Sequence, residues 1–180
     1  MGQAAGATAV IGSTGSGSGL VAKNYVAWQS LADVDPVSTS PIVMTFDALG
    51  HEGTACATLN ADTKTIDVSV TGIFVVSFLG KFQWTGQALA VLDYLEAHLA
   101  FTCADANALA NVPAPGFWVD QRAFDQANSG AGYFQLTTPP LALASGDSFQ
   151  LSIAATVTPA ASVAPTVPEG QSTIAIERLA

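Results

Sequence analysis

Basic residues are scarce in this sequence. Its 180 residues include five lysines and arginines against 14 aspartates and glutamates, which gives a formal net charge of −9. A protein that binds nucleic acid needs a basic surface that neutralises phosphates, and attraction to an anionic membrane surface needs one too. We therefore expect neither nucleic acid nor a membrane as a partner.

Charge of either sign is also rare. Charged residues make up 11% of the chain and hydrophobic residues 49%, whereas a globular protein has roughly 25% charged residues. An isolated monomer would have few charges with which to keep its surface in water. We therefore expect much of the surface to be buried against other subunits.

Long hydrophobic runs are missing, and so is a secretory signal. No apolar stretch approaches the roughly 20 residues that span a bilayer, and the opening residues 1–6 carry no basic segment. A secretory signal begins with such a segment. The sequence therefore predicts synthesis in the cytoplasm without a signal peptide.

Cysteine is limited to Cys56 and Cys103. Two cysteines are too few for a disulfide framework, and a structural zinc site takes four ligands. Without a signal for export to an oxidising compartment we favour two buried thiols, with a single bridge as the alternative.

The first 38 residues differ from the rest. Residues 12–19 alternate glycine with serine or threonine, which is typical of a flexible linker, and a short apolar and aromatic patch follows. We interpret residues 1–38 as an extended N-terminal arm and residues 39–180 as the folded domain. Because the arm has little of its own to fold around, we expect neighbouring chains to hold it, with Tyr25, Trp28 and Leu31 as the partner-binding anchors.

From residue 40 onward the pattern predicts strands. Residues 65–70 alternate apolar and polar side chains, and residues 73–82 are rich in β-branched and aromatic types. Residues 87–103 fit a helix or a strand, and we favour strands there. Short strands separated by turns indicate an all-β antiparallel sandwich or jelly roll.

The order of four motifs resembles the C1q/TNF-like jelly-roll family. An opening strand from Pro41 to Phe46, the strand from Thr71 to Phe78, the turn at Gly146-Asp147 and the closing strand from Ser172 to Leu179 follow one another as in that family, over roughly residues 40–180. We interpret Asp147 as shaping its turn by accepting backbone hydrogen bonds.

The resemblance implies a homotrimer with aromatic residues along its three-fold axis. It places these residues at the trimer interface or in the core: Phe74, Phe78, Phe82, Phe149, Ile174 and Ile176. No cofactor is expected, although some relatives of this fold bind calcium, and the carboxylates of Asp33 with Asp35, Asp120 with Asp125 and Asp47 with Glu52 leave that alternative open.

No pattern in the sequence indicates an enzyme. The two histidines, His51 and His98, have no nucleophile placed in a strand–turn–helix context beside them. Several aromatic side chains could stack on sugars, although we favour core or axis packing for them: Trp84, Phe117, Trp118, Tyr133 and Phe134.

We therefore expect a non-enzymatic virion structural protein. In this interpretation a homotrimeric jelly roll decorates and stabilises a capsid shell, binding the major capsid protein or other virion proteins through its arm. The alternative is a receptor- or glycan-binding head of a phage or viral fibre, or a secreted C1q-like recognition module, with contacts from loops 105–118 and 158–170.

Overall fold

The computed structural model describes residues 24–36, 40–48, 56–85, 94–103, 117–123, 129–156 and 164–180. These residues form strands and no helix, so they contain no helix that could cross a membrane. The strands are β1 (Asn24–Ser30), β2 (Ile42–Val43), β3 (Phe46–Ala48), β4 (Ala57–Leu59), β5 (Ile66–Val68), β6 (Gly72–Thr85), β7 (Tyr94–Thr102), β8 (Phe117–Ala123), β9 (Ser129–Thr137), β10 (Leu141–Leu143), β11 (Ser148–Thr156), β12 (Ala164–Thr166) and β13 (Ser172–Arg178).

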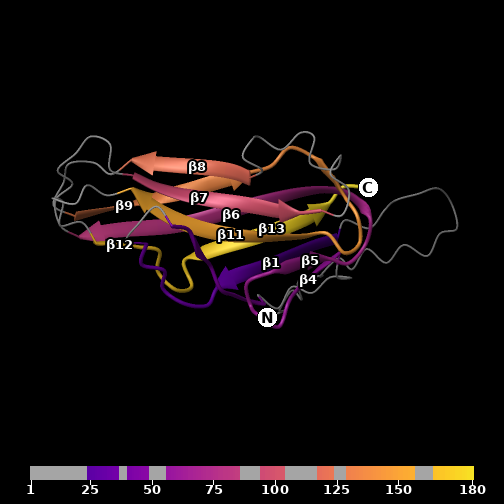
Figure 1. Cartoon of the computed structure of the whole chain (residues 1–180), viewed down its shortest axis with the longest axis horizontal. Coiled ribbons are helices and arrows are strands. Elements are labelled where there is room, and N and C mark those ends of the chain that lie inside the picture. The colour runs from indigo at the N-terminus through magenta and orange to yellow at the C-terminus, as the bar shows by residue number, and fades with distance from the viewer. Residues whose placement is uncertain are drawn as a thin grey trace, which may run out of the picture.

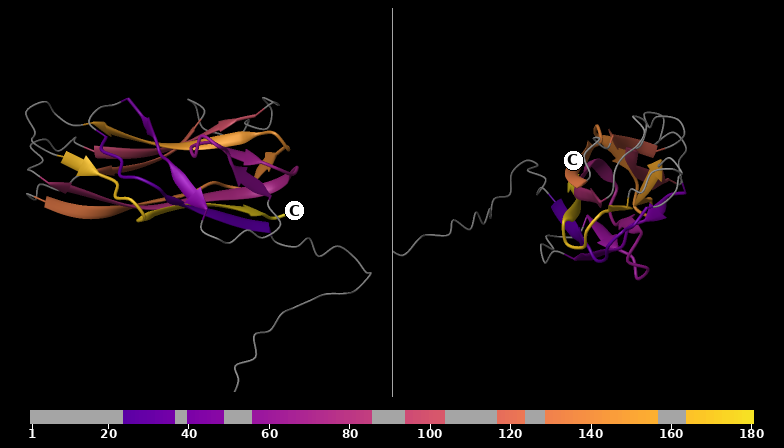
Figure 2. Two further views of the ribbon diagram at one scale, coloured as in Figure 1. Left: turned by 90° about the horizontal axis from the view of Figure 1, so that it is seen from below. Right: turned by 90° about the vertical axis from the view of Figure 1, so that its left-hand side faces the viewer.

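The strands form two antiparallel sheets that pack face to face (Figure 1). In the β6 sheet the order is β10-β6-β13-β1-β3, and β9 and β12 also pair with β6. In the β11 sheet the order is β4-β5-β11-β7-β8, and β2 also pairs with β11. The left view of Figure 2 shows the two sheets as two layers. The predicted all-β jelly-roll sandwich is confirmed.

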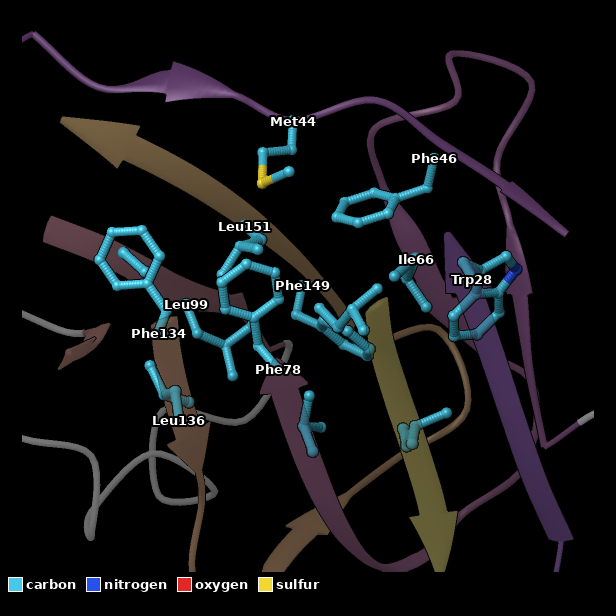
Figure 3. Close-up of a cluster of buried hydrophobic side chains, with 14 of the residues drawn as sticks. Trp28, Met44, Phe46, Ile66, Phe78, Leu99, Phe134, Leu136, Phe149 and Leu151 are labelled. Carbon is cyan, nitrogen blue, oxygen red and sulfur yellow. The ribbon is translucent and has the colours of Figure 1, made fainter. Parts of the chain in front are cut away.

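The core is built by strands whose side chains alternate between buried and outward-facing positions. Along β6, Phe74, Val76 and Phe78 are buried while the residues between them face outward, and β7 buries Leu95, Ala97 and Leu99 in the same way. Figure 3 shows side chains from both sheets meeting in one core. Because successive side chains of a strand point to opposite faces, each sheet supplies one apolar face to the sandwich.

The six residues assigned to the trimer interface or the core all lie in this interior. Each of them is at most 3% exposed: Phe74, Phe78, Phe82, Phe149, Ile174 and Ile176. They pack between the two sheets of one chain, so they belong to the core and present no surface to a neighbouring copy.

Glycines make room for the largest side chains where β6 and β9 pair. Phe82 lies opposite Gly132, and Trp84 lies opposite Gly130. A Cβ atom at either glycine would overlap the ring of its partner. The two glycines therefore allow a tight row of rings, in which the centroids of Phe82 and Trp84 are 5.9 Å apart and those of Phe82 and Phe134 are 4.9 Å apart.

Part of the predicted arm is a strand of the sandwich. β1 lies between β13 and β3, and Trp28 is 2% exposed in the core. The prediction that Trp28 anchors a partner is therefore wrong, because burying its indole against the core removes it from any surface. Tyr25 and Leu31 are 47% and 43% exposed, and their contact with a partner stays a prediction. Residues 1–23 lie outside the described residues.

The residues after β1 are also held by their own chain. Val34 and Val167 exchange two backbone hydrogen bonds of 3.0 and 2.8 Å. The Asp33 carboxylate accepts a bond from the amide of Glu169, and Asp35 accepts one from the hydroxyl of Thr166, each 2.7 Å long. Residues 30–36 therefore close one end of the sandwich against the segment that precedes β13.

Several local predictions are confirmed. Residues 94–102 of the ambiguous segment form a strand, whereas residues 87–93 lie outside the described residues. The Asp147 carboxylate accepts a 2.8 Å bond from the amide of Ala144 and shapes the turn before β11.

Neither cysteine forms a disulfide, and Cys56 is buried while Cys103 is half-buried. Burial raises the pKa of the Cys56 thiol, while a backbone hydrogen bond and the charge of Arg178 act in the opposite direction. The Cys56 thiol is therefore a core side chain rather than a reactive one.

Candidate interaction face of the β6 sheet

The first half of β6 carries large apolar residues on both of its faces. Phe74, Val76 and Phe78 point into the core, but Ile73 and Leu79, between and beside them, are also large apolar residues and are 37% and 56% exposed. Near-continuous apolar runs of this kind are typical of strands that are buried on both sides. The β11 sheet covers one side of β6, and none of the described residues covers the other.

The pairing register aligns the outward side chains of β1, β13, β6 and β9 into rows. Each row joins residues that lie directly opposite one another in neighbouring strands. In order along β6 the rows are Tyr25–Glu177–Val75, Ala27–Ala175–Ser77–Thr137, Gln29–Thr173–Leu79–Gln135 and Lys81–Tyr133.

The second row makes a trough across the sheet. Its side chains are short, whereas Tyr25 rises on one side of it and Leu79 on the other. The result is a depression of about 400 Å³, with Ser77, Ala175 and Thr137 in its lining. A depression bounded by larger apolar groups is a surface into which a complementary side chain can pack.

The most exposed large apolar side chains of the described residues stand beside this trough. Tyr133 is 62% exposed, Leu79 56% and Tyr25 47%. An exposed apolar cluster of this kind marks an interaction site, and tyrosine is enriched in such sites because it combines a large apolar ring with a hydroxyl.

Charge on these rows is low and balanced. Among them, Glu177 carries the one negative charge and Lys81 the one positive charge, while Asp47 of β3 lies at the sheet edge opposite Gln29. With Asp47 counted, this face has a net charge of −1, although the whole chain has a formal charge of −9.

The outward face of the β11 sheet is polar along β11 and β7. β11 presents Ser148, Gln150 and Ser152 on this face, and β7 presents Glu96 and His98. The Nε2 atom of His98 lies 3.0 Å from Oε2 of Glu96, and His98 is in register with Ser152. The histidine therefore uses Nε2 for the carboxylate on an open strand face. A serine nucleophile would need that nitrogen, with the carboxylate on the other one.

The remaining sequence candidates do not gather at one place. Phe134 and Trp84 are buried while Tyr133 is exposed, so these three do not form one sugar-stacking platform. Asp33 and Asp35 bind the chain's own backbone and hydroxyl groups. Within the described ranges no group of three or more metal-ligating side chains occurs, and Asp125 and Glu52 lie outside them; calcium binding stays a prediction.

The contact residues predicted from the sequence missed most of the outward face of the β6 sheet. Of the residues assigned to partner binding, the trimer interface or the core, Tyr25 and Phe78 line the trough, whereas Leu79 was given no role and Tyr133 was expected in the core or along the trimer axis. The signal was present in the sequence, because Ile73, Val75 and Leu79 recur at every second or fourth position between the core residues of the same strand.

Solved structures share this fold. Murine APRIL, crystallised at pH 8.0, superposes with a TM-score of 0.50 at 9% identity, covering 88% of this chain and 100% of that chain. Eiger TNF from S. frugiperda gives a TM-score of 0.50 at 14% identity, covering 87% of this chain and 94% of that chain. No family model matches the sequence, and no curated protein matches it. The likeness shows a TNF-like jelly-roll fold.

Proposed function

We propose that this chain is a non-enzymatic binding module that assembles as a homotrimer through the outward face of the β6 sheet. The observation that carries the proposal is the concentration of exposed apolar side chains on this face, where Tyr25 and Leu79 border the trough and Tyr133 stands one row beyond Leu79. The TNF-like fold supports a trimer, since the family that the sequence resembles associates in threes.

Burial of this face would supply the free energy of association. Complete burial of a large apolar side chain stabilises by about 1.5–3 kcal/mol, and several must be buried together to exceed the entropy lost on association. Copies that each carry a charge of −9 repel one another. A contact face with a net charge of only −1 keeps that repulsion small where the copies touch.

Native mass spectrometry of the full chain, paired with two substitutions, tests the proposal. The expected mass is three times the 18.3 kDa of one chain. We expect Leu79→Glu to shift this trimer to monomers, because it places three carboxylates in the apolar contact. Val119→Glu is the matched control, since Val119 is 44% exposed on β8 of the other sheet.

Both variants should keep the wild-type circular dichroism, because neither side chain packs in the core. A wild-type chain that stays monomeric at all concentrations would reject the proposal. So would a trimer that is lost in Val119→Glu but kept in Leu79→Glu.

Within this class we propose a capsid decoration protein, made in the host cytoplasm and bound to the major capsid protein or other virion proteins. The support is the scarcity of charge and the Gly/Ser-rich residues 12–19 that precede β1. A receptor- or glycan-binding head of a fibre, or a secreted C1q-like recognition module, is the competing role of the same trimer.

Deletion of residues 1–23 followed by binding to purified particles separates these roles. The deletion must end before Asn24, because β1 is part of the sandwich and Trp28 fills its core. A decoration protein should lose capsid binding while its unfolding temperature stays unchanged. Undiminished capsid binding together with lost cell adsorption would instead identify a receptor-binding head.

A further inference from the structure

The outward face of the β6 sheet carries a projecting ring and a trough at different places. Tyr133 stands in the row of Lys81, and the trough follows the row of Ser77. The two rows are four residues apart along β6, which is about 13 Å at 3.3 Å per residue. A projection and a depression that do not coincide fit each other only between two copies.

The two charged side chains of these rows are also separated. Lys81 lies directly across from Tyr133, and Glu177 lies across from Tyr25 beside the trough. Glu177 is opposite Val75, six residues along β6 from Lys81, so the two are about 20 Å apart in one chain. They cannot form an ion pair within a single copy.

We propose that Tyr133 of one copy inserts into the trough of the next copy and brings Lys81 of the first to Glu177 of the second. The inference rests on the proposed trimer and assigns its contact. When the Tyr133 ring lies in the Ser77 row of the second copy, Lys81 of the first copy lies in that same row. Glu177 of the second copy is then one row away. The four-carbon stem of a lysine side chain spans that separation.

Charge complementarity identifies the occupant of the trough as a second copy of this chain. The projecting side carries the positive charge, and the trough side carries the negative one. In the proposed trimer each copy gives its ring to one neighbour and receives a ring from the other, which is a head-to-tail contact.

Charge reversal tests the pair. We expect Lys81→Glu and Glu177→Lys each to weaken the trimer roughly tenfold or more, because each juxtaposes like charges across the contact. The double variant Lys81→Glu/Glu177→Lys restores the opposite charges and should regain most of the wild-type affinity. Sedimentation equilibrium over a concentration series measures all three.

Matched controls make the same charge changes away from the face. Lys64→Glu lies in the exposed turn between β4 and β5, and Glu169→Lys lies exposed before β13; neither should change the association constant. Tyr133→Ala should weaken the trimer roughly 30-fold, the usual effect of truncating an aromatic at the centre of an interface.

Zero-length carbodiimide cross-linking of the wild-type trimer gives a test that needs no variant. A Lys81–Glu177 cross-link between chains, found by peptide mass mapping, supports the pairing. A trimer without that cross-link overturns it, and so do single charge reversals that leave the trimer intact or a double variant that fails to recover. A wild-type monomer would instead reject the proposed function itself.

Discussion

The two outward faces of the sandwich differ although the two inward faces are alike. Both sheets send apolar side chains into one core, as Phe78 does from β6 and Leu99 from β7. Outward, the β6 sheet exposes Leu79 and Tyr133, whereas β11 and β7 of the other sheet present hydroxyl, amide and ionisable groups, with Val119 of β8 as an exposed apolar exception. Alternation alone accounts for the inward faces. The outward difference shows which face is made for contact with protein and which for water.

The largest predicted effect is a difference in the free energy of unfolding between variants of two adjacent β6 residues that point to opposite sides. Phe78→Ala removes a ring from the core and should lower the free energy of unfolding by about 3–5 kcal/mol. Leu79→Ala, measured at concentrations where the chain is monomeric, should change it by less than about 0.5 kcal/mol, as an exposed substitution does. Urea unfolding of both variants measures the difference. Equal losses would mean that Leu79 packs within its own chain, and the comparison of the two faces would fail.

A second contrast lies one strand away. Gly132→Ala places a methyl group against the ring of Phe82, and the resulting overpacking should cost about 1–3 kcal/mol. The adjacent Ala131→Val points outward and should stay within about 0.5 kcal/mol of wild type. Thermal unfolding of the two variants measures this difference in stability. A Gly132→Ala variant as stable as wild type would show that the packed rings beside Gly132 tolerate more volume than the structure indicates.

A smaller effect is expected on the polar face. Glu96→Gln removes the ion pair with His98, which at a partly exposed position contributes about 0–1 kcal/mol. Its trimer should dissociate at the wild-type concentration, because the substitution lies on the face that stays in water. A change in the association constant would place the β11 sheet in the contact and reverse the comparison.

The smallest effect lies in the turn between β4 and β5. Hydrogen bonds from the amides of Lys64 and Thr65 and from the Thr65 hydroxyl hold the pKa of Asp62 below its usual range. A depressed carboxyl pKa contributes stability above the unfolded value of about 3.9, and that contribution is lost as the pH falls through the folded pKa.

Asp62→Asn should therefore unfold at a slightly lower temperature than wild type at neutral pH, and the difference should shrink with acid. Calorimetric scans of both proteins across the acid range measure it. A difference that grew with acid would mean that the carboxylate is not stabilised by these bonds.

Much of the fold was predictable because its signals are local. The run from Thr71 to Phe78 has the composition of a strand, and Gly146 with Asp147 marks the turn that the structure contains. β1 was missed because it follows a Gly/Ser-rich segment, and its outward positions Ala27 and Gln29 weaken the contrast with the buried Val26 and Trp28. Its place between β13 and β3 depends on pairing with residues nearly 150 positions away.

The contact face was not predictable in the same way. From Ile73 to Leu79 the residues at odd and at even positions are apolar apart from Ser77, so period two over that stretch shows two faces but not which one points inward. The pairing of β6 with β13 and β9 settles this, and it also brings Ala175 and Thr137 beside Ser77 to make the trough. Sequence reasoning therefore left Phe74, Phe78 and Ile174 open between a trimer interface and the core, and the structure places them in the core.

Hydroxyl-radical footprinting at concentrations below and above assembly tests the central claim most directly. The account predicts that Tyr25, Leu79 and Tyr133 lose reactivity when the chain assembles, while Val119 and Tyr94 on the β11 sheet keep theirs. Loss of reactivity on the β11 sheet, with Leu79 and Tyr133 still fully reactive in the assembled protein, would contradict it.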